Sequence, residues 1–181
     1  LSRSSTLLGE SGLIEDARRV AQRIEPLVSQ CTVSDVVDGL AGTVLGLLAL
    51  FDASGDAYAL ELAVLCGERL LNLGISPEEG CLSWRSEAGP SLLGISHGAA
   101  GISMALSRLA RASGREAFLS AAVAGILYED RFFSINQRNW PDLRPSLENG
   151  PDATLWPVQW CHGAAGGVLA RSSLLQVAPV V

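Results

Sequence analysis

Three stretches of the sequence decide the fold: DGLAGTVLGLLAL at 38–50, HGAAGISMALSRL at 97–109 and CHGAAGGVLARSSLL at 161–175. Each has a glycine within its first three residues and a second glycine three residues later, and continues with apolar residues at helical spacing. Self-similarity of this kind is the sequence signature of a repeat architecture. The sequence therefore predicts three copies of one helical unit.

The first two copies also end alike. Gly55 and Gly114, each closing an Ala-Ser-Gly, follow the opening glycines Gly39 and Gly98 at the same distance. A glycine at this place can take the left-handed conformation that ends a helix. A second apolar helix is predicted after each turn, at residues 56–73 and 115–133. Each repeat is thus predicted to be a helical hairpin.

These helices set the predicted fold class. Strand-like alternation is nowhere sustained, so the chain is predicted to be all-α. A further helix at 13–24, stopping before Pro26, is predicted to be the second helix of an earlier hairpin. Stacked hairpins form either an open superhelical array or a closed ring of inner and outer helices. The expected repeats lie in one domain over 1–181, near 35–73, 94–133 and 160–181.

Composition excludes several classes of function. The formal net charge is −6 and every basic residue is arginine, which argues against a nucleic-acid surface. The longest apolar run, 44–51, is far shorter than the ~18 residues of a membrane span. No signal peptide is recognisable. The four cysteines form no CxxC pair, so we expect a reducing, cytoplasmic location.

Each repeat places a chemically active residue directly before its first glycine. These residues are Asp38, His97 and the pair Cys161-His162. Asp38 alone is interpreted as a helix N-cap. Cysteine thiolate and histidine nitrogen are preferred zinc ligands, but a zinc site needs at least three protein ligands. A complete site would therefore have to recruit His97 or another cysteine.

The other cysteines receive structural interpretations. Cys66 lies in the middle of a predicted helix and is expected to be a small core residue. Cys31 and Cys81 lie in connections, and no function is assigned to either.

Three motifs carry a resemblance to a known family: GISHGAAG at 94–101, NWPDLR at 139–144 and WCHGAAG at 160–166. In this order they resemble the cyclase domain of lanthionine synthetases, the LanC-like family. The similarity is greatest to the C-terminal cyclase domain of the bifunctional LanM-type lanthipeptide synthetases, and it runs from about residue 34 to 171.

The resemblance implies a fold and a site. The fold would be an α/α toroid with zinc at its centre, with Cys161 as one metal ligand, His97 as the catalytic acid and Asp35 as its acidic partner. Asp38 is the other register for that partner, and His162 is a weaker metal candidate. The family's later Cys-His pair has no counterpart here. We therefore expect a truncated fragment with an incomplete ring, incompetent alone.

The implied reaction is lanthipeptide ring closure. A cysteine thiol of a dehydrated precursor peptide would add to dehydroalanine or dehydrobutyrine and form a thioether. Zinc (Zn²⁺) is the implied cofactor. A dehydratase domain N-terminal to this chain in the full-length protein is the other implied partner.

Two other classes of function stay open. A carbohydrate-active enzyme with an α/α toroid would use paired carboxylates, for which Asp35, Asp38 and Glu87 are candidates. Such an enzyme has no chemical need for the WCHG at 160–163. A non-catalytic peptide-binding module of helical repeats is the second alternative. Zinc bound through Cys161 would distinguish the cyclase from both.

Overall fold

The computed structural model describes residues 4, 7, 9–10, 12–86, 89–144 and 154–177. The helices are α2 (Gly12–Val28), α3 (Leu40–Ser54), α4 (Ala57–Leu73), α5 (Ala99–Ser113), α6 (Glu116–Asp130) and α7 (Ala164–Leu175). Across these described ranges there is no strand, only isolated bridges in the long connections. The prediction of an all-α fold is confirmed. None of the described helices is both long enough and apolar enough to cross a membrane.

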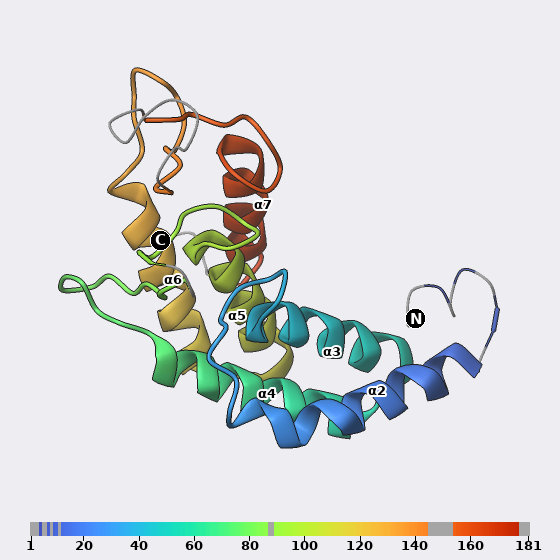
Figure 1. Cartoon of the computed structure of the whole chain (residues 1–181). Coiled ribbons are helices and arrows are strands. Elements are labelled where there is room, and N and C mark those ends of the chain that lie inside the picture. The colour runs from blue at the N-terminus through green and yellow to red at the C-terminus, as the bar shows by residue number, and fades with distance from the viewer. Residues whose placement is uncertain are drawn as a thin grey trace.

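The helices are arranged in two rows, which Figure 1 shows. In the first row α5 packs between α3 and α7, and in the second row α4 packs between α2 and α6. Each hairpin joins the rows, because α3 packs on α4 and α5 packs on α6. All three glycine-rich openings therefore begin helices of the same row.

The predicted helix ends are confirmed in the first two hairpins. Gly55 and Gly114 adopt φ angles of 67° and 70°, in the left-handed region. Their N–H groups donate to the last turn of the preceding helix, at 2.7 Å to Phe51 and 2.8 Å to Ala110. These are the positions at which a side chain would strain the backbone.

The prediction that the first helix stops before Pro26 is wrong. Helix α2 continues to Val28 with Pro26 inside it. A proline removes the hydrogen bond of its own N–H but leaves later donors intact. Val28 is only 2 % exposed, so the last turn is stabilised by burying this side chain.

The core confirms the structural interpretation of Cys66. This side chain is fully buried in α4, and burial raises the pKa of its thiol to about 12. Phe118 of α6 is also fully buried in the same core cluster. Tryptophans from the connections close the ends of the second row: Trp84 Nε1 donates to the carbonyl of Leu70 at 2.8 Å.

Helix α7 has an apolar surface. Val168, Leu169 and Leu175 are exposed, whereas Leu174 is half-buried against the core. Gln176 and Val177 form a turn after the helix.

Candidate active site

The loops before α3, α5 and α7 lie side by side at one end of the first row. The N–H of Val36 donates to the carbonyl of Ser96 at 3.0 Å, and the N–H of Ile95 donates to the carbonyl of Cys161 at 3.1 Å. Val36 and Ile95 occupy equivalent repeat positions, as do Ser96 and Cys161. One backbone contact is therefore used twice, and it brings the residues before the three glycines together.

The second glycine of each opening is required by close packing. A Cβ at Gly42 would lie 2.0 Å from the carbonyl oxygen of Val36. A Cβ at Gly101 would lie 1.9 Å from the carbonyl oxygen of Ile95. Only glycine lets the loop fold back onto the first helical turn in this way. The glycine spacing is thus a requirement of the loop that carries the candidate residues.

Asp35 and His97 form the central pair of the site. His97 Nδ1 lies 2.6 Å from Asp35 Oδ2, and Asp35 Oδ1 accepts the N–H of Asp38 at 2.8 Å. The two side chains are partly shielded, with exposures of 31 % for His97 and 17 % for Asp35. An ionised carboxylate accepts hydrogen bonds only, so Nδ1 carries the proton of this contact and Nε2 is left for proton exchange.

The structure distinguishes the two candidate acidic residues. Asp35, rather than Asp38, contacts His97 directly, and the side chain of Asp38 is exposed. The prediction that Asp38 caps the helix is wrong. Gly39 is the N-cap of α3 and no side chain caps it. The loop instead satisfies the Asp38 N–H with the Asp35 carboxylate.

Cys161 lies on the neighbouring loop, half-buried. Its Sγ donates to Gln159 Oε1 at 3.4 Å, a weak thiol contact. Its carbonyl accepts both the N–H and the Oγ hydroxyl of Ser96, each at 3.3 Å. The backbone of Cys161 is therefore hydrogen-bonded to the His97 loop, while its thiol takes no part in these hydrogen bonds.

His162 lies next to this pair. Its ring centroid is 6.3 Å from that of His97. Within the part of the chain that the structure describes, its buried Nε2 has no hydrogen-bond partner. Burial lowers the pKa of His162, Arg144 adds to this effect and Asp142 opposes it. His162 is therefore neutral at pH 7, with a buried nitrogen that a metal or a substrate group could satisfy.

Asn139 holds the Cys161 loop in place. Its Oδ1 accepts the N–H of Ala164 at the start of α7, at 2.8 Å, and its Nδ2 donates to the carbonyl of Pro157 at 2.8 Å. The side chain is 3 % exposed. The local sequence gives no sign of this role, because the side chain caps a helix that begins 25 residues further along the chain.

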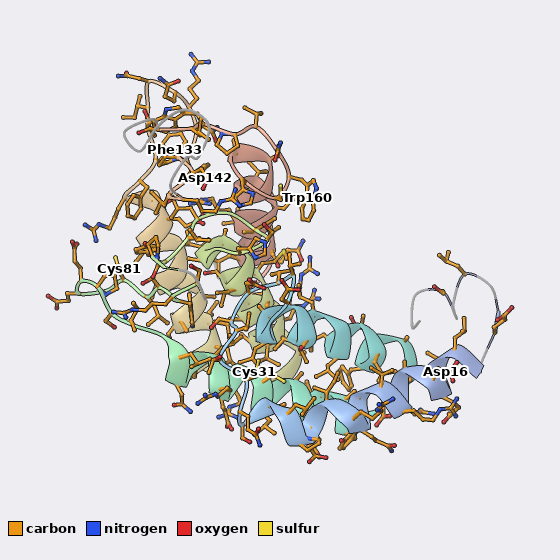
Figure 2. All side chains as sticks on the ribbon, in the orientation of Figure 1. Asp16, Cys31, Cys81, Phe133, Asp142 and Trp160 are labelled. Atoms are coloured by element: carbon orange, nitrogen blue, oxygen red, sulfur yellow. The ribbon has the colours of Figure 1, made fainter. Side chains whose placement is uncertain are left out.

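Asp142 and Arg144 add charges beside the histidine pair. Arg144 donates to both carboxylate oxygens of Asp142, with Nη2 2.6 Å from Oδ2. Burial alone would raise the pKa of Asp142, but the hydrogen bonds from Arg144 hold it below its ordinary value. Both residues act electrostatically on His162. In Figure 2 Asp142 lies in the same upper part of the molecule as Trp160.

The described residues offer one group with enough ligands for a metal ion. Asp35, Asp38 and His97 have ligand atoms that all lie within 4.8 Å of one another. This is an oxygen-rich set, and the hydrogen bond from Asp35 already occupies one nitrogen of His97. Cys161 is the soft ligand that zinc prefers, and its thiol fits such a role. Within the described residues no group of three ligands contains Cys161.

Cys31 and Cys81 lie in other parts of the molecule than Trp160 (Figure 2). Trp160 is the neighbour of Cys161 in the sequence. Cys31 donates to a backbone carbonyl in its own loop. Glu87, the third carboxylate of the carbohydrate hypothesis, lies outside the described residues.

Comparison with known protein families gives a match that covers nearly the whole chain. The model of a family described as lanthionine synthetase C-like protein matches residues 1–179. A search of curated proteins found no match. The matched range contains all three loops that meet at the site.

Proposed function

This chain belongs to the lanthionine synthetase C-like family, and from that premise we propose that it is a zinc-dependent cyclase of lanthipeptide biosynthesis. Its substrate is a dehydrated precursor peptide. A cysteine thiol of that peptide adds to the β-carbon of a dehydroalanine or dehydrobutyrine and closes a thioether ring. The proposal includes the LanM type, in which a dehydratase domain of the same protein prepares the substrate.

The Asp35–His97 hydrogen bond is the observation that carries this proposal. A carboxylate 2.6 Å from Nδ1 orients the imidazole and stabilises its protonated form, as in other acid-base pairs. The loop of His97 is bonded to the loop of Cys161 through Ile95. This arrangement supports an acid-base residue working next to a thiolate-bound metal.

The proton balance assigns one role to each residue of the pair. Nε2 of His97 receives the proton that the substrate thiol loses. The thiolate sulfur then forms a bond to the β-carbon, and the electron pair of the double bond moves into the adjacent carbonyl as an enolate. Nε2 returns the proton to the α-carbon. Asp35 stabilises the imidazolium between the two transfers.

Cys161 is proposed as one zinc ligand, with His162 as a weaker candidate and further ligands outside the described residues. Bound zinc would lower the pKa of the substrate thiol, so that thiolate is present at neutral pH. Within the described part of the chain the buried Nε2 of His162 has no hydrogen-bond partner, which supports a role in binding a metal ion or a substrate group.

A carbohydrate-active enzyme is less well supported. Both oxygens of the Asp35 carboxylate already accept hydrogen bonds, from His97 and from the N–H of Asp38. A carboxylate engaged in this way is poorly placed to act as one of the two acid-base carboxylates of glycoside hydrolysis.

A thiol-counting assay tests the proposed function. The protein, expressed from its complete reading frame, is incubated with a peptide that contains cysteine and dehydroalanine. Cyclisation leaves the mass unchanged, so free thiols are alkylated and counted by mass spectrometry. We expect faster thiol loss than in buffer, and stoichiometric zinc. Zinc-loaded protein that gives no acceleration would exclude the cyclase, and zinc-free protein that only binds the peptide would indicate a binding module.

A further inference from the structure

A buried carboxylate outside the pair contacts the loop of His97. Glu129, near the end of α6, is 1 % exposed. Its Oε1 accepts the N–H of Gly94 at 2.6 Å and the N–H of Ala100 at 3.1 Å. These two donors lie on either side of His97 in the sequence. Burying a carboxylate is costly unless hydrogen bonds compensate, so these contacts fix the ends of the loop.

The second oxygen of Glu129 faces α7. Nη1 of Arg171 lies 3.5 Å from Oε2 of Glu129. The guanidinium group of Arg171 also lies over the ring of Trp140, 4.4 Å from the ring centroid. Burial raises the pKa of Glu129, while the hydrogen bond from Gly94 and the charge of Arg171 oppose this shift. Glu129 therefore joins the His97 loop to the helix that follows Cys161.

The first hairpin shows that the fold does not require a carboxylate here. Leu70 of α4 is the equivalent of Glu129, because the backbone carbonyl of each accepts an indole N–H. Trp84 donates to Leu70 at 2.8 Å, and Trp140 donates to Glu129 at 3.0 Å. Leu70 is fully buried. A leucine thus satisfies the same packing position in the repeat that lacks the histidine.

The loop hydrogen bonds differ in the same way. In the first hairpin the N–H of Ala41 donates to the carbonyl of Ser34, within its own loop. The equivalent N–H of Ala100 donates to Glu129 instead. Gly94 adopts a φ of 93°, which its partner in the first loop, Asp35, does not share. The loop that carries His97 therefore differs in conformation from the equivalent loop of the first hairpin, and Glu129 is the carboxylate that contacts it.

We propose that Glu129 is a positioning residue that sets the His97 loop relative to Asp35 and Cys161. It acts through the backbone of residues 94–100 and through Arg171, and it does not touch the substrate. This inference rests on the proposed function. Misplacement of a catalytic group by about 1 Å can cost about 100-fold in rate.

The histidine side chains give a direct readout. The ring Cε1–H signals of His97 and His162 in NMR spectra are assigned by comparison with variants that lack each histidine in turn. We expect Glu129→Leu, the residue of the first hairpin, to shift or broaden the His97 signal. Glu129→Gln keeps an oxygen acceptor for the N–H of Gly94, so we expect its His97 signal to resemble that of the wild type. If the leucine variant does not fold, Glu129→Asp replaces it, because its shorter side chain cannot reach both donors.

Asp130→Asn is the matched control. Asp130 neighbours Glu129 on α6 and also pairs with Arg171, but it is exposed. We expect this variant to leave the His97 signal unchanged. In the cyclisation assay we expect Glu129→Leu to lose about 100-fold in kcat with KM retained, and Glu129→Gln to recover most of it.

The outcomes separate this inference from the proposed function. A wild-type protein that cyclises peptides, with a Glu129→Leu variant that is folded and has unchanged kcat and an unchanged His97 signal, would overturn the positioning role alone. A shifted His97 signal in a protein that never accelerates cyclisation would support the positioning role and reject the cyclase. A lower melting temperature without a change in kcat or in the His97 signal would mean that Glu129 is only structural.

Discussion

The backbone N–H of Ile95 donates to the carbonyl of Cys161 at 3.1 Å. The loop of the proposed acid is thereby joined to the loop of the proposed metal ligand through the backbone. Ser96 adds two further bonds to the same carbonyl. Since the backbone sets this geometry, substitutions of the His97 or Cys161 side chains should alter chemistry more than folding.

Substitution of the central pair should separate the roles of its members. We expect His97→Asn to lower kcat for cyclisation by about 100- to 10,000-fold, the range of general acid-base catalysis. Asp35→Asn removes a charge-assisted hydrogen bond and should cost about 10- to 100-fold. Steady-state kinetics with a dehydrated peptide measure both.

Asp38→Asn is the matched control for this pair. It changes the carboxylate three residues away in the same loop but keeps the N–H that donates to Asp35. Its kcat should stay near that of the wild type. An equal loss in Asp35→Asn and Asp38→Asn would contradict the role given to the Asp35 contact and would favour a metal held by Asp35, Asp38 and His97.

Two glycines of α3 should respond to alanine in opposite directions. A Cβ at Gly42 would meet the carbonyl oxygen of Val36 at 2.0 Å, so Gly42→Ala should lower the free energy of unfolding by about 1–3 kcal/mol. Gly46 has no atom within 4 Å of such a Cβ, so Gly46→Ala should raise it by about 0.5–1 kcal/mol. Urea unfolding compares them, and similar effects at both positions would disprove the packing argument.

The parts of the fold that the sequence predicts well depend on local signals. Gly55 and Gly114 end their helices with left-handed backbone, and the apolar spacing that defines α3 and α5 is present within each segment. Pro26 shows the limit of such signals. The helix continues past it because Val28 is buried against distant parts of the chain, which a local pattern does not reveal.

The site was predictable where it follows the repeat. His97 and Cys161 can be singled out from their places before two of the three glycines, where the repeat itself offers Asp38 in the first copy, and Asp35 follows only from the resemblance. Asn139 and Glu129 were missed, because each acts on backbone groups far away in the sequence. For Glu129 a signal existed: alignment of the two hairpins places this acid opposite Leu70, in a helix face that is otherwise apolar.

Thiol reactivity should distinguish two of the cysteines. In metal-free protein we expect iodoacetamide at pH 8 to modify the half-buried Cys161 but not Cys66, which is fully buried and has a pKa raised to about 12. Peptide mapping by mass spectrometry locates the label. Added zinc should protect Cys161, and chelation should restore its labelling. If the extent of Cys161 labelling is the same with and without zinc, Cys161 is not a zinc ligand.

The half-buried His162 should make stability depend on pH in a defined window. Burial lowers the pKa of His162 in the folded protein below the ordinary 6.5. At pH values between the folded and the unfolded pKa, the unfolded chain binds more protons than the folded protein, so the free energy of unfolding rises with pH. The contribution of His162 to this free energy is fully present above pH about 6.5. Stability should therefore decrease as the pH falls below that value.

His162→Gln should remove this dependence, because glutamine does not titrate. Urea unfolding at several pH values between 5 and 7.5 measures the slope in both proteins. Asp142, whose pKa is held below its ordinary 3.8, contributes stability that is lost only at lower pH, so the two effects occupy separate windows. A wild-type protein whose stability is flat from pH 7.5 to 5, or a glutamine variant with the same slope as the wild type, would show that His162 is not the group that resists protonation.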